Sequence, residues 1–451
     1  MSLRFGTDGM RGVAGRDLTT AVVEALGRAG AEKLGGDGFA VGRDTRESGP
    51  DLCRALHRGV ARAGGRSVDL GMLPTPAVAR WCDDEQVAGA VVSASHNPWV
   101  DNGLKLFAPG GRKLSDRLQD SIQERFDELV GQMPAGPARH PTPVDAHRQA
   151  ARRHVDAVVA SIDGRSLEGV RVIVDAAHGA ATEVAPAALI ELGADVTVIH
   201  ADPDGRNINL ACGSTHPGSL QAAVLDAPGS VGLAFDGDAE RVLAVDERGE
   251  VVDGDQIIAV CAIDRAARGV LAGRGVVVTV MTNLGFRRSM KAHDITVVDT
   301  AVGDRHVLEA VDEGGFALGG EQSGHVIFRE LATTGDGLLT SVQLLDVMRR
   351  RGSSLADLHA AAMTRLPQVL RGVPLTGSRS GLDALIDPIV AESAARLGAN
   401  GRILVRASGT EPLVRVMVEA DEVRAAEAEA ARVSEAVEAA LTRRSARRDA
   451  S

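Results

Sequence analysis

The sequence predicts an α/β protein with three topologically similar α/β domains, each with a mixed, mainly parallel sheet, and a smaller α+β C-terminal domain. Apolar β-branched runs alternate with helical patterns along most of the 451 residues, which is typical of α/β layers around a largely parallel sheet. A pair of strand-and-loop segments also recurs three times, and from about residue 366 the pattern changes. Three related domains and one different domain account for both observations.

The repeat consists of two strand-and-loop segments in each domain. The first segment reads FAVGRDTRES near residue 39, VRVIVDAAHGAA near 170 and GVVVTVMTNLG near 275. The second reads AGAVVSASHNP from 88, VGLAFDGDAER from 231 and FALGGEQSGH from 316. Any strand-to-helix connection uses Gly, Ser and Asp, so this likeness alone leaves open whether the segments repeat one unit.

One surface helix is expected over residues 115–130, before Gly131. Its apolar residues recur at three- and four-residue spacing: Leu118, Ile122, Phe126 and Leu129. Residues 131–143 then concentrate Gly and Pro without periodicity, which indicates the end of the first domain. A further helix from about Asp145 leads into the second domain.

The C-terminal domain is expected to end in a helix with Val433, Val437 and Leu441 on one face. The last residues, TRRSARRDAS, are expected to form a frayed basic tail. The predicted domain boundaries are 1–150, 151–252, 253–365 and 366–451.

Composition excludes several classes of protein. The apolar fraction of 44% and the charged fraction of 25% are ordinary for a globular protein, and no run approaches the roughly 18 apolar residues of a membrane helix. The N-terminal residues lack the apolar core of a secretion signal, so we expect a cytoplasmic protein with no membrane partner.

The cysteines and the charge exclude two further classes. Four cysteines lie far apart without a CxxC spacing, which argues against a zinc knuckle and a disulfide framework and predicts buried free thiols. A net charge of −11 and an aromatic fraction of 2% disfavour nucleic acid as a partner. If the ligand is an anion, the cations that bind it must therefore be local to the site.

The first loop whose side chains could take part in a reaction is SASHNP. It follows an apolar run that is expected to be a buried strand. Ligands of open α/β sheets gather at the carboxyl ends of strands. A serine hydroxyl needs a base or a cation to become a nucleophile, and His96 and Lys105 lie close to Ser95 in sequence. The alternative is a polar turn ended by Pro98. The segment does not match the GxSxG elbow of ester hydrolases.

The second loop, FDGDAER, places Asp236, Asp238 and Glu240 at alternate positions after an apolar strand, with Arg241 adjacent. Carboxylates spaced in this way can converge on one point, and hard oxygen ligands suit Mg²⁺. Two alternatives remain open: a solvated acidic turn, and an aspartyl nucleophile that becomes phosphorylated.

Two later loops carry groups that suit a sugar phosphate. GGEQSGHVIF offers Glu321, Ser323 and His325 between glycines, a mixture that hydroxyl-rich ligands need. RASGTEPLVR surrounds a tight turn with guanidinium groups, hydroxyls and backbone N–H groups, which is how a dianionic phosphate is held. Taken alone, a Gly-rich loop is usually an ordinary turn, and Arg406 or Arg415 is more often part of a surface ion pair.

These four segments, in this order, resemble the α-D-phosphohexomutase superfamily, whose members move a phosphoryl group between the C1 and C6 oxygens of a hexose. The resemblance extends from RFGTDGMRG at residue 4 to RASGTEP at 406–412. Within the superfamily, SASHNP, PDGRNINLACGSTHP at 203–217 and GEQSGH with Gln322 are similar to the branch that acts on glucosamine phosphates. The resemblance implies four domains around a central cleft and a hexosamine phosphate as substrate.

The resemblance also implies roles for residues near the reacting groups. Ser95 would be the phosphoserine that donates and recovers the phosphoryl group, and Mg²⁺ would lie between it and the carboxylates Asp236, Asp238 and Glu240. Lys105 and His325 would be the general acid and base. A sugar 1,6-bisphosphate would be the intermediate and activator.

Further residues would bind charge and substrate. Arg11 and Arg43 would support charge near Ser95, and Arg241 would steady the same region. Glu321 and Ser323 would bind sugar hydroxyls. The remaining phosphate would be held by the last loop: Arg406, Ser408, Gly409, Thr410 and Arg415. The resemblance allows a monomer or a homodimer.

One position departs from the superfamily pattern. The metal loop ordinarily reads DGDxDR, whereas Glu240 here is one methylene longer than aspartate. Because Mg²⁺ demands near-octahedral geometry at about 2.0 to 2.1 Å, the loop must shift or Glu240 must reorient. Three other activities remain open: a phosphomannomutase or phosphoglucomutase, an aspartyl-phosphate phosphatase built on Asp236, and a non-catalytic sugar-phosphate sensor.

Overall fold

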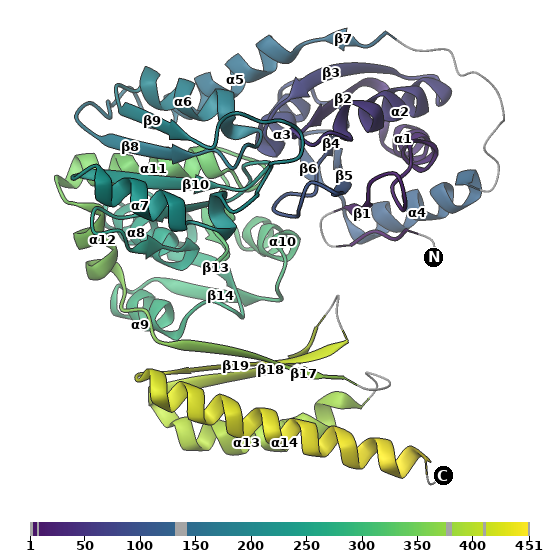
Figure 1. Ribbon diagram of the computed structural model, residues 1–451. Coiled ribbons are helices and arrows are strands. Elements are labelled where there is room, and N and C mark those ends of the chain that lie inside the picture. Colours follow the sequence, from purple (N-terminus) through teal and green to yellow (C-terminus); the bar gives the residue numbers. More distant parts are fainter. Residues whose placement is uncertain (1–2, 7–8, 131–141, 376–380, 409–411, 450–451) are drawn as a thin grey trace. The chain divides into compact units, whose positions relative to one another are not determined.

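The chain forms two compact units. The first comprises Met1–Met281 and Met290–Ala362, and the second comprises Thr282–Ser289 and Met363–Ser451. This computed structural model, shown in Figure 1, describes residues 3–6, 9–130, 142–375, 381–408 and 412–449. The expected Gly- and Pro-rich boundary at 131–143 lies almost wholly outside the described residues.

The first sheet has the strand order β1-β5-β4-β2-β3-β7, with β6 paired to β5. Neighbouring strands from β4 to β7 are parallel, and β5 is antiparallel to β4. The strands are β1 (Met10–Val13), β2 (Asp37–Arg43), β3 (Arg66–Met72), β4 (Gly89–Val92), β5 (Asp101–Ala108), β6 (Arg112–Lys113) and β7 (Val144–Asp145). The helices are α1 (Thr20–Leu34), α2 (Gly49–Arg62), α3 (Thr75–Asp84) and α4 (Asp116–Val130).

The second sheet has the order β12-β11-β10-β8-β9. Its strands are β8 (Arg171–Asp175), β9 (Asp195–Ile199), β10 (Ser230–Phe235), β11 (Val242–Val245) and β12 (Val251–Val252). The accompanying helices are α5 (His147–Ala160), α6 (Ala181–Glu191), α7 (Gly218–Asp226) and the short 3₁₀ helix η1 (Gly213–Thr215). Every residue of β10 is buried, as its continuous apolar run predicts.

The third sheet has the order β14-β13-β15-β16. Its strands are β13 (Gly275–Thr279), β14 (Thr296–Thr300), β15 (Leu318–Gly320) and β16 (Val326–Phe328). The helices of this region are α8 (Gly254–Ala267), η2 (Ala272–Arg274), α9 (Leu284–Ala292), α10 (Asp304–Gly314), α11 (Gly337–Arg351) and α12 (Leu355–Ala362). Asp253 and Gln256 form a capping box at the start of α8, which satisfies otherwise unpaired N–H groups.

The three sheets share one strand order, which confirms the predicted repeat of α/β units. The equivalent strands are β3-β2-β4-β5, β9-β8-β10-β11 and β14-β13-β15-β16. In each set the first three neighbours are parallel and the fourth strand is antiparallel to the third. The loops with Ser95, Asp236 and Glu321 therefore follow equivalent strands, β4, β10 and β15.

The second unit is an α+β domain, as the sequence predicts. Its antiparallel sheet has the order β17-β19-β18, and both α13 and α14 lie on one face of it (Figure 1). The elements are β17 (Gln368–Pro374), β18 (Gly401–Ala407), β19 (Leu413–Ala420), α13 (Leu382–Leu397), η3 (Gly398–Asn400) and α14 (Val423–Asp449). The predicted apolar face of α14 packs against Val414, Val416 and Val418 of β19.

The prediction of a frayed C-terminal tail is wrong for most of its residues, because α14 continues to Asp449. Arginine and alanine, which dominate this segment, both have high helix propensity, and the packed part of α14 supplies the nucleus that a free peptide lacks. The boundaries predicted for the domains within the first unit stay predictions.

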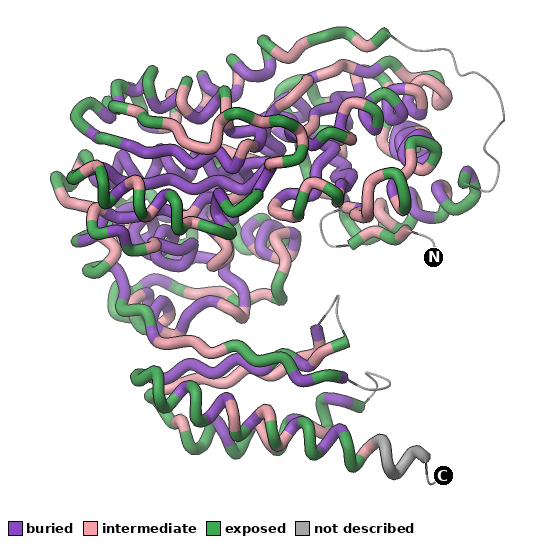
Figure 2. The backbone as a smooth tube through the Cα atoms, viewed as in Figure 1, coloured by how far each residue is buried: buried purple, intermediate pink, exposed green. Residues whose placement is uncertain are grey.

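Burial follows the sheets in both units (Figure 2). In the first domain, α1 and α2 approach closely, since a Cβ added at Gly59 would lie 2.2 Å from the carbonyl oxygen of Glu24. All four cysteines are buried and free, as predicted. Among the helices that the structure describes, none is long and apolar enough to cross a bilayer.

Candidate active site

Ser95 lies just beyond the carboxyl end of β4 in a tight, buried turn. Its backbone has the left-handed φ of +52°, which is uncommon for a residue other than glycine and is characteristic of functional turns. The Ser95 N–H donates to Ser93 Oγ at 2.9 Å. Only 2% of Ser95 is exposed, so its hydroxyl is directed into the protein rather than into bulk solvent.

The hydroxyl of Ser95 meets the acidic loop that follows β10. Ser95 Oγ donates to Asp236 Oδ2 at 2.6 Å, and His96 Nδ1 lies 3.3 Å from the same hydroxyl. The two loops come from different sheets, and 141 residues separate the bonded pair. Two motifs that are unrelated in sequence thus form one site.

The acidic loop concentrates negative charge inside the protein. Asp236 and Asp238 are fully buried, and Glu240 is 3% exposed. Burial, together with the nearby charge of Asp238, raises the pKa of Asp236 to about 7. Such a group of buried carboxylates favours a cation near it.

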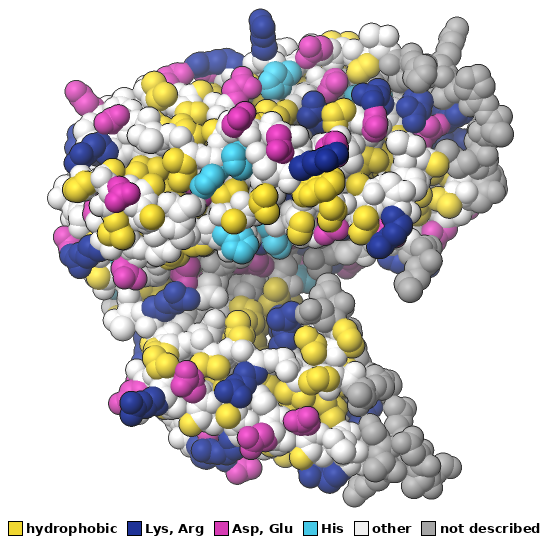
Figure 3. All heavy atoms as spheres, viewed as in Figure 1, with side chains coloured by type: hydrophobic (Ala, Val, Ile, Leu, Met, Phe, Trp, Pro, Cys, Tyr) yellow, Lys and Arg dark blue, Asp and Glu magenta, His cyan; other side chains and the backbone are white. Residues whose placement is uncertain are grey.

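Lys105 supplies part of that positive charge. It lies on β5, paired with Val91 of β4, and its Nζ donates to Asp238 Oδ2 at 2.8 Å and to Glu240 Oε2 at 2.5 Å. Lys113 on β6 adds a second ammonium group, 3.6 Å from Glu240 Oε1. Charged side chains of both signs are interspersed on the face of the protein shown in Figure 3.

The oxygen donors of this site fit Mg²⁺. The hydroxyl of Ser95 and the carboxylates of Asp236 and Asp238 are hard ligands of the type that Mg²⁺ prefers. Hydroxyl groups orient the carboxylates: Thr75 Oγ1 donates to Asp238 Oδ2 at 2.7 Å, and Thr334 Oγ1 donates to Glu240 Oε1 at 3.3 Å. Glu240 thus contacts both lysines and Thr334, and its role as a metal ligand stays a prediction.

A second group of potential ligands adjoins Glu240. One ligand atom each of Glu240, Asp304 and His325 lie within 4.8 Å of one another. His325 Nε2 lies 3.8 Å from Asp304 Oδ2, and Lys113 forms an ion pair with the same carboxylate. Because this group includes an imidazole, it suits Mg²⁺ less well than the oxygen donors around Ser95.

The loop after β15 joins the acidic loop through the backbone. Arg241 and His325 form an isolated antiparallel bridge, which places the predicted acid/base histidine beside the metal loop. Glu321 Oε1 accepts from the Gly303 N–H at 2.9 Å, and Glu321 Oε2 accepts from Ser323 Oγ at 3.3 Å. Both predicted sugar-binding side chains therefore hold one another in place.

Arg241 and His96 lie beside each other at the Ser95 turn, and Arg241 supplies the positive charge. The Arg241 N–H donates to Asp236 Oδ1 at 3.0 Å, and Arg241 Nη1 lies 3.3 Å from His96 Nδ1. Burial, followed by the charges of Arg241 and Arg11, lowers the pKa of His96 to about 4. His96 is therefore neutral at physiological pH.

The other two predicted arginines are placed less directly. Arg11 Nη1 donates to the carbonyl oxygen of Ala94 at 3.5 Å, beside the Ser95 turn. Arg43 Nη1 donates to the carbonyl oxygen of Asp44 at 3.3 Å. The role of Arg43 in supporting charge near Ser95 stays a prediction.

Arg46, which the sequence analysis missed, supports the backbone of the Ser95 turn. It is fully buried, pairs with Asp44 Oδ2 at 2.8 Å, and its Nη2 donates to the carbonyl oxygens of Ser95 at 3.0 Å and Asn97 at 2.9 Å. Its Nη1 donates to the carbonyl oxygens of Pro98 at 2.5 Å and Asp101 at 3.0 Å. Asp304 and Lys113 were also missed, since neither belongs to a recognisable motif.

In the second unit, Arg406 and Arg415 lie directly opposite each other on β18 and β19. Burial, together with the charge of Arg415, lowers the pKa of Arg406. Like charges at directly opposed strand positions destabilise a sheet, and an anion between them relieves the repulsion. The Ser408 N–H donates to the carbonyl oxygen of Leu413 at 2.8 Å, whereas Gly409 and Thr410 lie outside the described residues.

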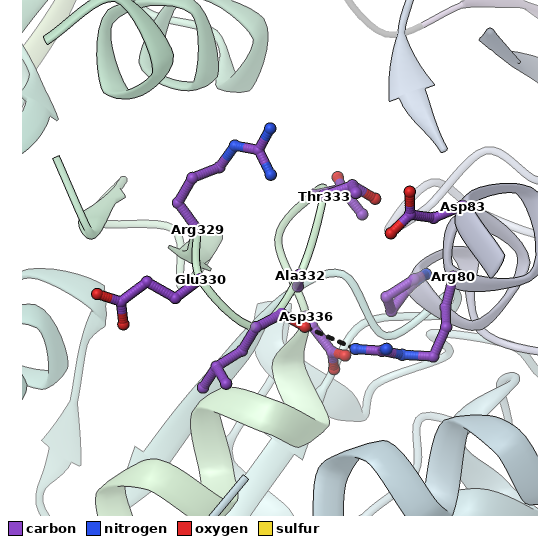
Figure 4. A pocket seen from close by; sticks show the side chains of 10 residues that line it. Arg80, Asp83, Arg329, Glu330, Ala332, Thr333 and Asp336 are labelled. Atoms are coloured by element: carbon purple, nitrogen blue, oxygen red, sulfur yellow. Dashed lines mark hydrogen bonds between the residues drawn. The ribbon is translucent and has the colours of Figure 1, made fainter. Parts of the chain in front are cut away.

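A cavity of about 240 Å³ adjoins the acidic site, between α3 and the loop at 329–336. Figure 4 shows Arg80 directed towards this loop, where it donates to the carbonyl oxygen of Leu331 at 2.6 Å. Thr334 lines the cavity and donates to Glu240 Oε1, so this residue borders both the cavity and the acidic site.

All four sections of the chain match one protein family. The matching descriptions are Phosphoglucomutase/phosphomannomutase, alpha/beta/alpha domain I at residues 2–131, domain II at 152–249, domain III at 253–366 and the C-terminal domain at 354–436. A phosphoglucosamine mutase of Frankia alni is 48% identical over 98% of this chain and 99% of its own length. A phosphoglucosamine mutase of Symbiobacterium thermophilum is 47% identical over 98% of this chain and 100% of its own.

Solved structures show the same fold. A phosphoglucomutase/phosphomannomutase family protein of Burkholderia thailandensis has a TM-score of 0.80 at 25% identity, covering 96% of this chain and 97% of its own. An Aspergillus fumigatus N-acetylphosphoglucosamine mutase, solved with GlcNAc-6P and magnesium, has a TM-score of 0.71 at 20% identity, covering 98% and 96%.

Proposed function

Because the chain belongs to the phosphoglucomutase/phosphomannomutase family, we propose that it interconverts glucosamine 6-phosphate and glucosamine 1-phosphate through a phosphoserine at Ser95. The chain is an isomerase with phosphoglucosamine mutase activity, as its relatives at about 48% identity over nearly the whole length indicate. The proposal concerns how its residues perform that reaction.

The observation that carries the proposal is the 2.6 Å hydrogen bond from Ser95 Oγ to Asp236 Oδ2. It places the only side-chain hydroxyl of the SHNP turn at the acidic loop, in a buried setting where water is a poor competitor. A serine in this position can accept a phosphoryl group and give it back. Mg²⁺, bound through Ser95, Asp236 and Asp238, would supply positive charge to the transferring phosphoryl oxygens.

The reaction proceeds in two balanced transfers. In the first, the bond from phosphorus to Ser95 Oγ breaks and Oγ takes a proton from an acid, while a bond from phosphorus to a sugar hydroxyl oxygen forms and that hydroxyl proton passes to a base. In the second, Ser95 Oγ loses its proton to a base and forms a bond to the other phosphorus of the sugar 1,6-bisphosphate, while the bond from that phosphorus to its sugar oxygen breaks and the sugar oxygen takes a proton from an acid. We assign the proton transfers to Lys105 and His325. Asp236 Oδ2 is the acceptor nearest to the Ser95 hydroxyl.

The phosphate that is not being transferred also needs a site. We assign it to the loop with Arg406, Ser408, Gly409, Thr410 and Arg415, because the opposed guanidinium groups of Arg406 and Arg415 favour an anion between them. Glu321 and Ser323 are assigned to sugar hydroxyls, and Arg11, Arg43 and Arg241 to charge near Ser95. The neutral His96 is assigned a catalytic role beside the Ser95 hydroxyl. We further propose that the protein acts in the cytoplasm on small sugar phosphates.

The aspartyl-phosphate alternative differs in the residue that carries the phosphate. Asp236 Oδ2 accepts from Ser95 Oγ and its Oδ1 accepts from the Arg241 N–H, so the two candidate phosphate acceptors lie in contact and only the position of the phosphate distinguishes them. The phosphomannomutase and phosphoglucomutase alternatives differ only in the sugar.

Intact-mass analysis with peptide mapping, combined with an isomerisation assay, tests the proposal. We expect one phosphate on Ser95 and conversion of glucosamine 6-phosphate with a higher kcat/KM than glucose or mannose 6-phosphate. Phosphate on Asp236, or release of inorganic phosphate without isomerised sugar, would contradict it. Full phosphorylation of Ser95 with substrate binding but no turnover would instead favour a sensor.

A further inference from the structure

We propose that Asn209 is a positioning residue for Ser95. Asn209 belongs to the neighbouring α/β domain and holds Ser95 in place by hydrogen bonds to the backbone of the Ser95 turn. The inference rests on the proposed function and gives a role to the segment 203–217, which carries no assigned task in the reaction. The sequence of this segment, PDGRNINLACGSTHP, offers no acid, base or nucleophile in a recognisable arrangement.

The amide of Asn209 contacts the nucleophile turn directly. Its Nδ2 donates to the carbonyl oxygen of Ser95 at 2.9 Å and lies 3.2 Å from the carbonyl oxygen of Asn97. Asn209 is buried, and these two bonds use both N–H groups of the amide. They fix the peptide plane that follows Ser95, and therefore help to hold the turn in which Oγ contacts Asp236.

The same amide lies against the metal loop. A Cβ added at Gly237 would meet Asn209 Nδ2 at 2.9 Å and the Ser95 carbonyl oxygen at 2.7 Å. Glycine is therefore needed between the two aspartates so that its backbone, the Ser95 carbonyl and the Asn209 amide can share this space. Asn209 sets the spacing between the Ser95 turn and the loop of Asp236.

Asn209 itself is held by the second sheet. Its N–H donates to the carbonyl oxygen of Ala177 at 2.9 Å, and its own backbone has a left-handed φ of +59°. Asp175 lies at the end of β8, and its carboxylate accepts from the Ala177 N–H at 2.9 Å and the Gly213 N–H at 2.8 Å. It therefore links the loop after β8 to the segment that carries Asn209. His200 Nδ1 lies 3.0 Å from the same carboxylate.

The N-terminal part of the segment also contacts the first domain, through residues other than Asn209. Arg206 forms two hydrogen bonds with Glu47, at 2.8 and 3.0 Å, and its guanidinium lies 5.2 Å from the Trp99 ring centroid. The Glu47 N–H donates to the carbonyl oxygen of Gly205 at 2.8 Å. The segment therefore spans both domains and delivers one buried amide to the reacting serine.

Arg46 and Asn209 both donate to the carbonyl oxygen of Ser95, but they have different roles. Arg46 belongs to the same domain as Ser95 and holds the turn within that domain. Asn209 comes from the domain of Asp236, so it alone of the two couples the orientation of the nucleophile to the acidic loop. Misplacement of a reacting group by about 1 Å can cost about 10²-fold in rate.

The test compares Asn209→Asp and Asn209→Ala with Asn207→Asp in the full-length protein. Asn209→Asp replaces the donor by an acceptor facing two carbonyl oxygens, and Asn209→Ala removes the amide. Asn207 lies two residues away in the same segment, and its side chain accepts from the Asp204 N–H and donates to the carbonyl oxygen of Asp202 in its own loop. Asn207→Asp is therefore a matched control.

We expect both Asn209 variants to lower kcat at least tenfold, with KM for glucosamine 6-phosphate within about threefold of wild type. Single-turnover transfer of phosphate between Ser95 and the sugar should slow by the same factor, while Asn207→Asp stays near wild type. Unfolding midpoints are measured alongside.

Three outcomes would overturn the inference. They are kcat within twofold of wild type in Asn209→Ala, an equal loss in Asn207→Asp, or loss of substrate binding together with activity in Asn209→Ala. Failure of the wild-type enzyme to isomerise the substrate would instead contradict the proposed function. Different results therefore contradict the role of Asn209 and the proposed function.

Discussion

Lys105 Nζ lies 2.5 Å from Glu240 Oε2, and each side chain is only 3% exposed. This buried bond joins β5 to the acidic loop, and the same ammonium contacts Asp238 at 2.8 Å. One lysine thus compensates two carboxylates in a region where charge is weakly screened.

Replacing Lys105 by methionine should destabilise the protein. The change leaves two buried carboxylates without their shared cation, which costs about 3–5 kcal/mol when a buried pair is broken. Urea unfolding with and without Mg²⁺ measures the change in the free energy of unfolding. We expect Mg²⁺ to stabilise Lys105→Met more than wild type, because the ion replaces the lost charge. Equal stabilisation of both proteins would show that the ion binds elsewhere.

The role of Glu240 as a metal ligand is tested by changing its length and its charge separately. Glu240→Asp restores the usual third aspartate and should retain activity within a few-fold of wild type. Glu240→Gln keeps the length and removes the charge, and should raise the Mg²⁺ concentration for half-maximal activity by about 10-fold or more. If the two variants require the same Mg²⁺ concentration, Glu240 is not a ligand.

Ser95→Ala should abolish both phosphorylation and isomerisation, because it removes the hydroxyl that contacts Asp236 at the acidic loop. Binding of glucosamine 6-phosphate, measured by calorimetry, should persist. Measurable turnover in a preparation whose intact mass confirms the substitution would remove Ser95 from the mechanism.

Arg406→Ala should affect binding and stability in opposite directions. Removing one of two opposed guanidinium groups relieves a repulsion of about 0.2–1 kcal/mol, so the unfolding free energy should be unchanged or slightly higher. KM should rise about tenfold or more, because a charge-assisted bond to phosphate is lost. Exposed Arg424→Ala on α14 is a control. Unchanged kcat/KM would place the phosphate site elsewhere.

Stability should fall at acidic pH through His154. Burial lowers the pKa of this fully buried imidazole, although the nearby Asp336 charge opposes the effect. The folded state therefore binds a proton less readily than the unfolded chain, whose histidine titrates near about 6.5. His154 contributes stability above that pH, and the contribution is lost as pH falls below it.

Urea unfolding between pH 5 and 8 measures this effect. His154→Gln should flatten the slope below about pH 6.5, whereas His293→Gln, at an exposed position, should leave it unchanged. The same slope in all three proteins would assign the pH dependence to other groups.

Much of this molecule follows from local sequence. The repeated α/β units are predicted because each strand carries an apolar run and each following loop carries Gly, Ser or Asp. Ser95, Asp236, Asp238 and His325 could be selected as candidates because the chemistry requires these residue types directly after buried strands. The length of α14 was mispredicted, since charge in its last turns suggested a tail and propensity extended the helix.

The tertiary structure decided which side chains work together. The roles of Arg46, Asn209 and Asp304 are not readable from sequence, because their partners are backbone carbonyl oxygens, which every residue offers, or side chains from a distant loop. Sequence determines where a strand ends and which group follows it. The meeting of Ser95 with Asp236 depends on how two sheets pack, and packing is a property of many residues at once.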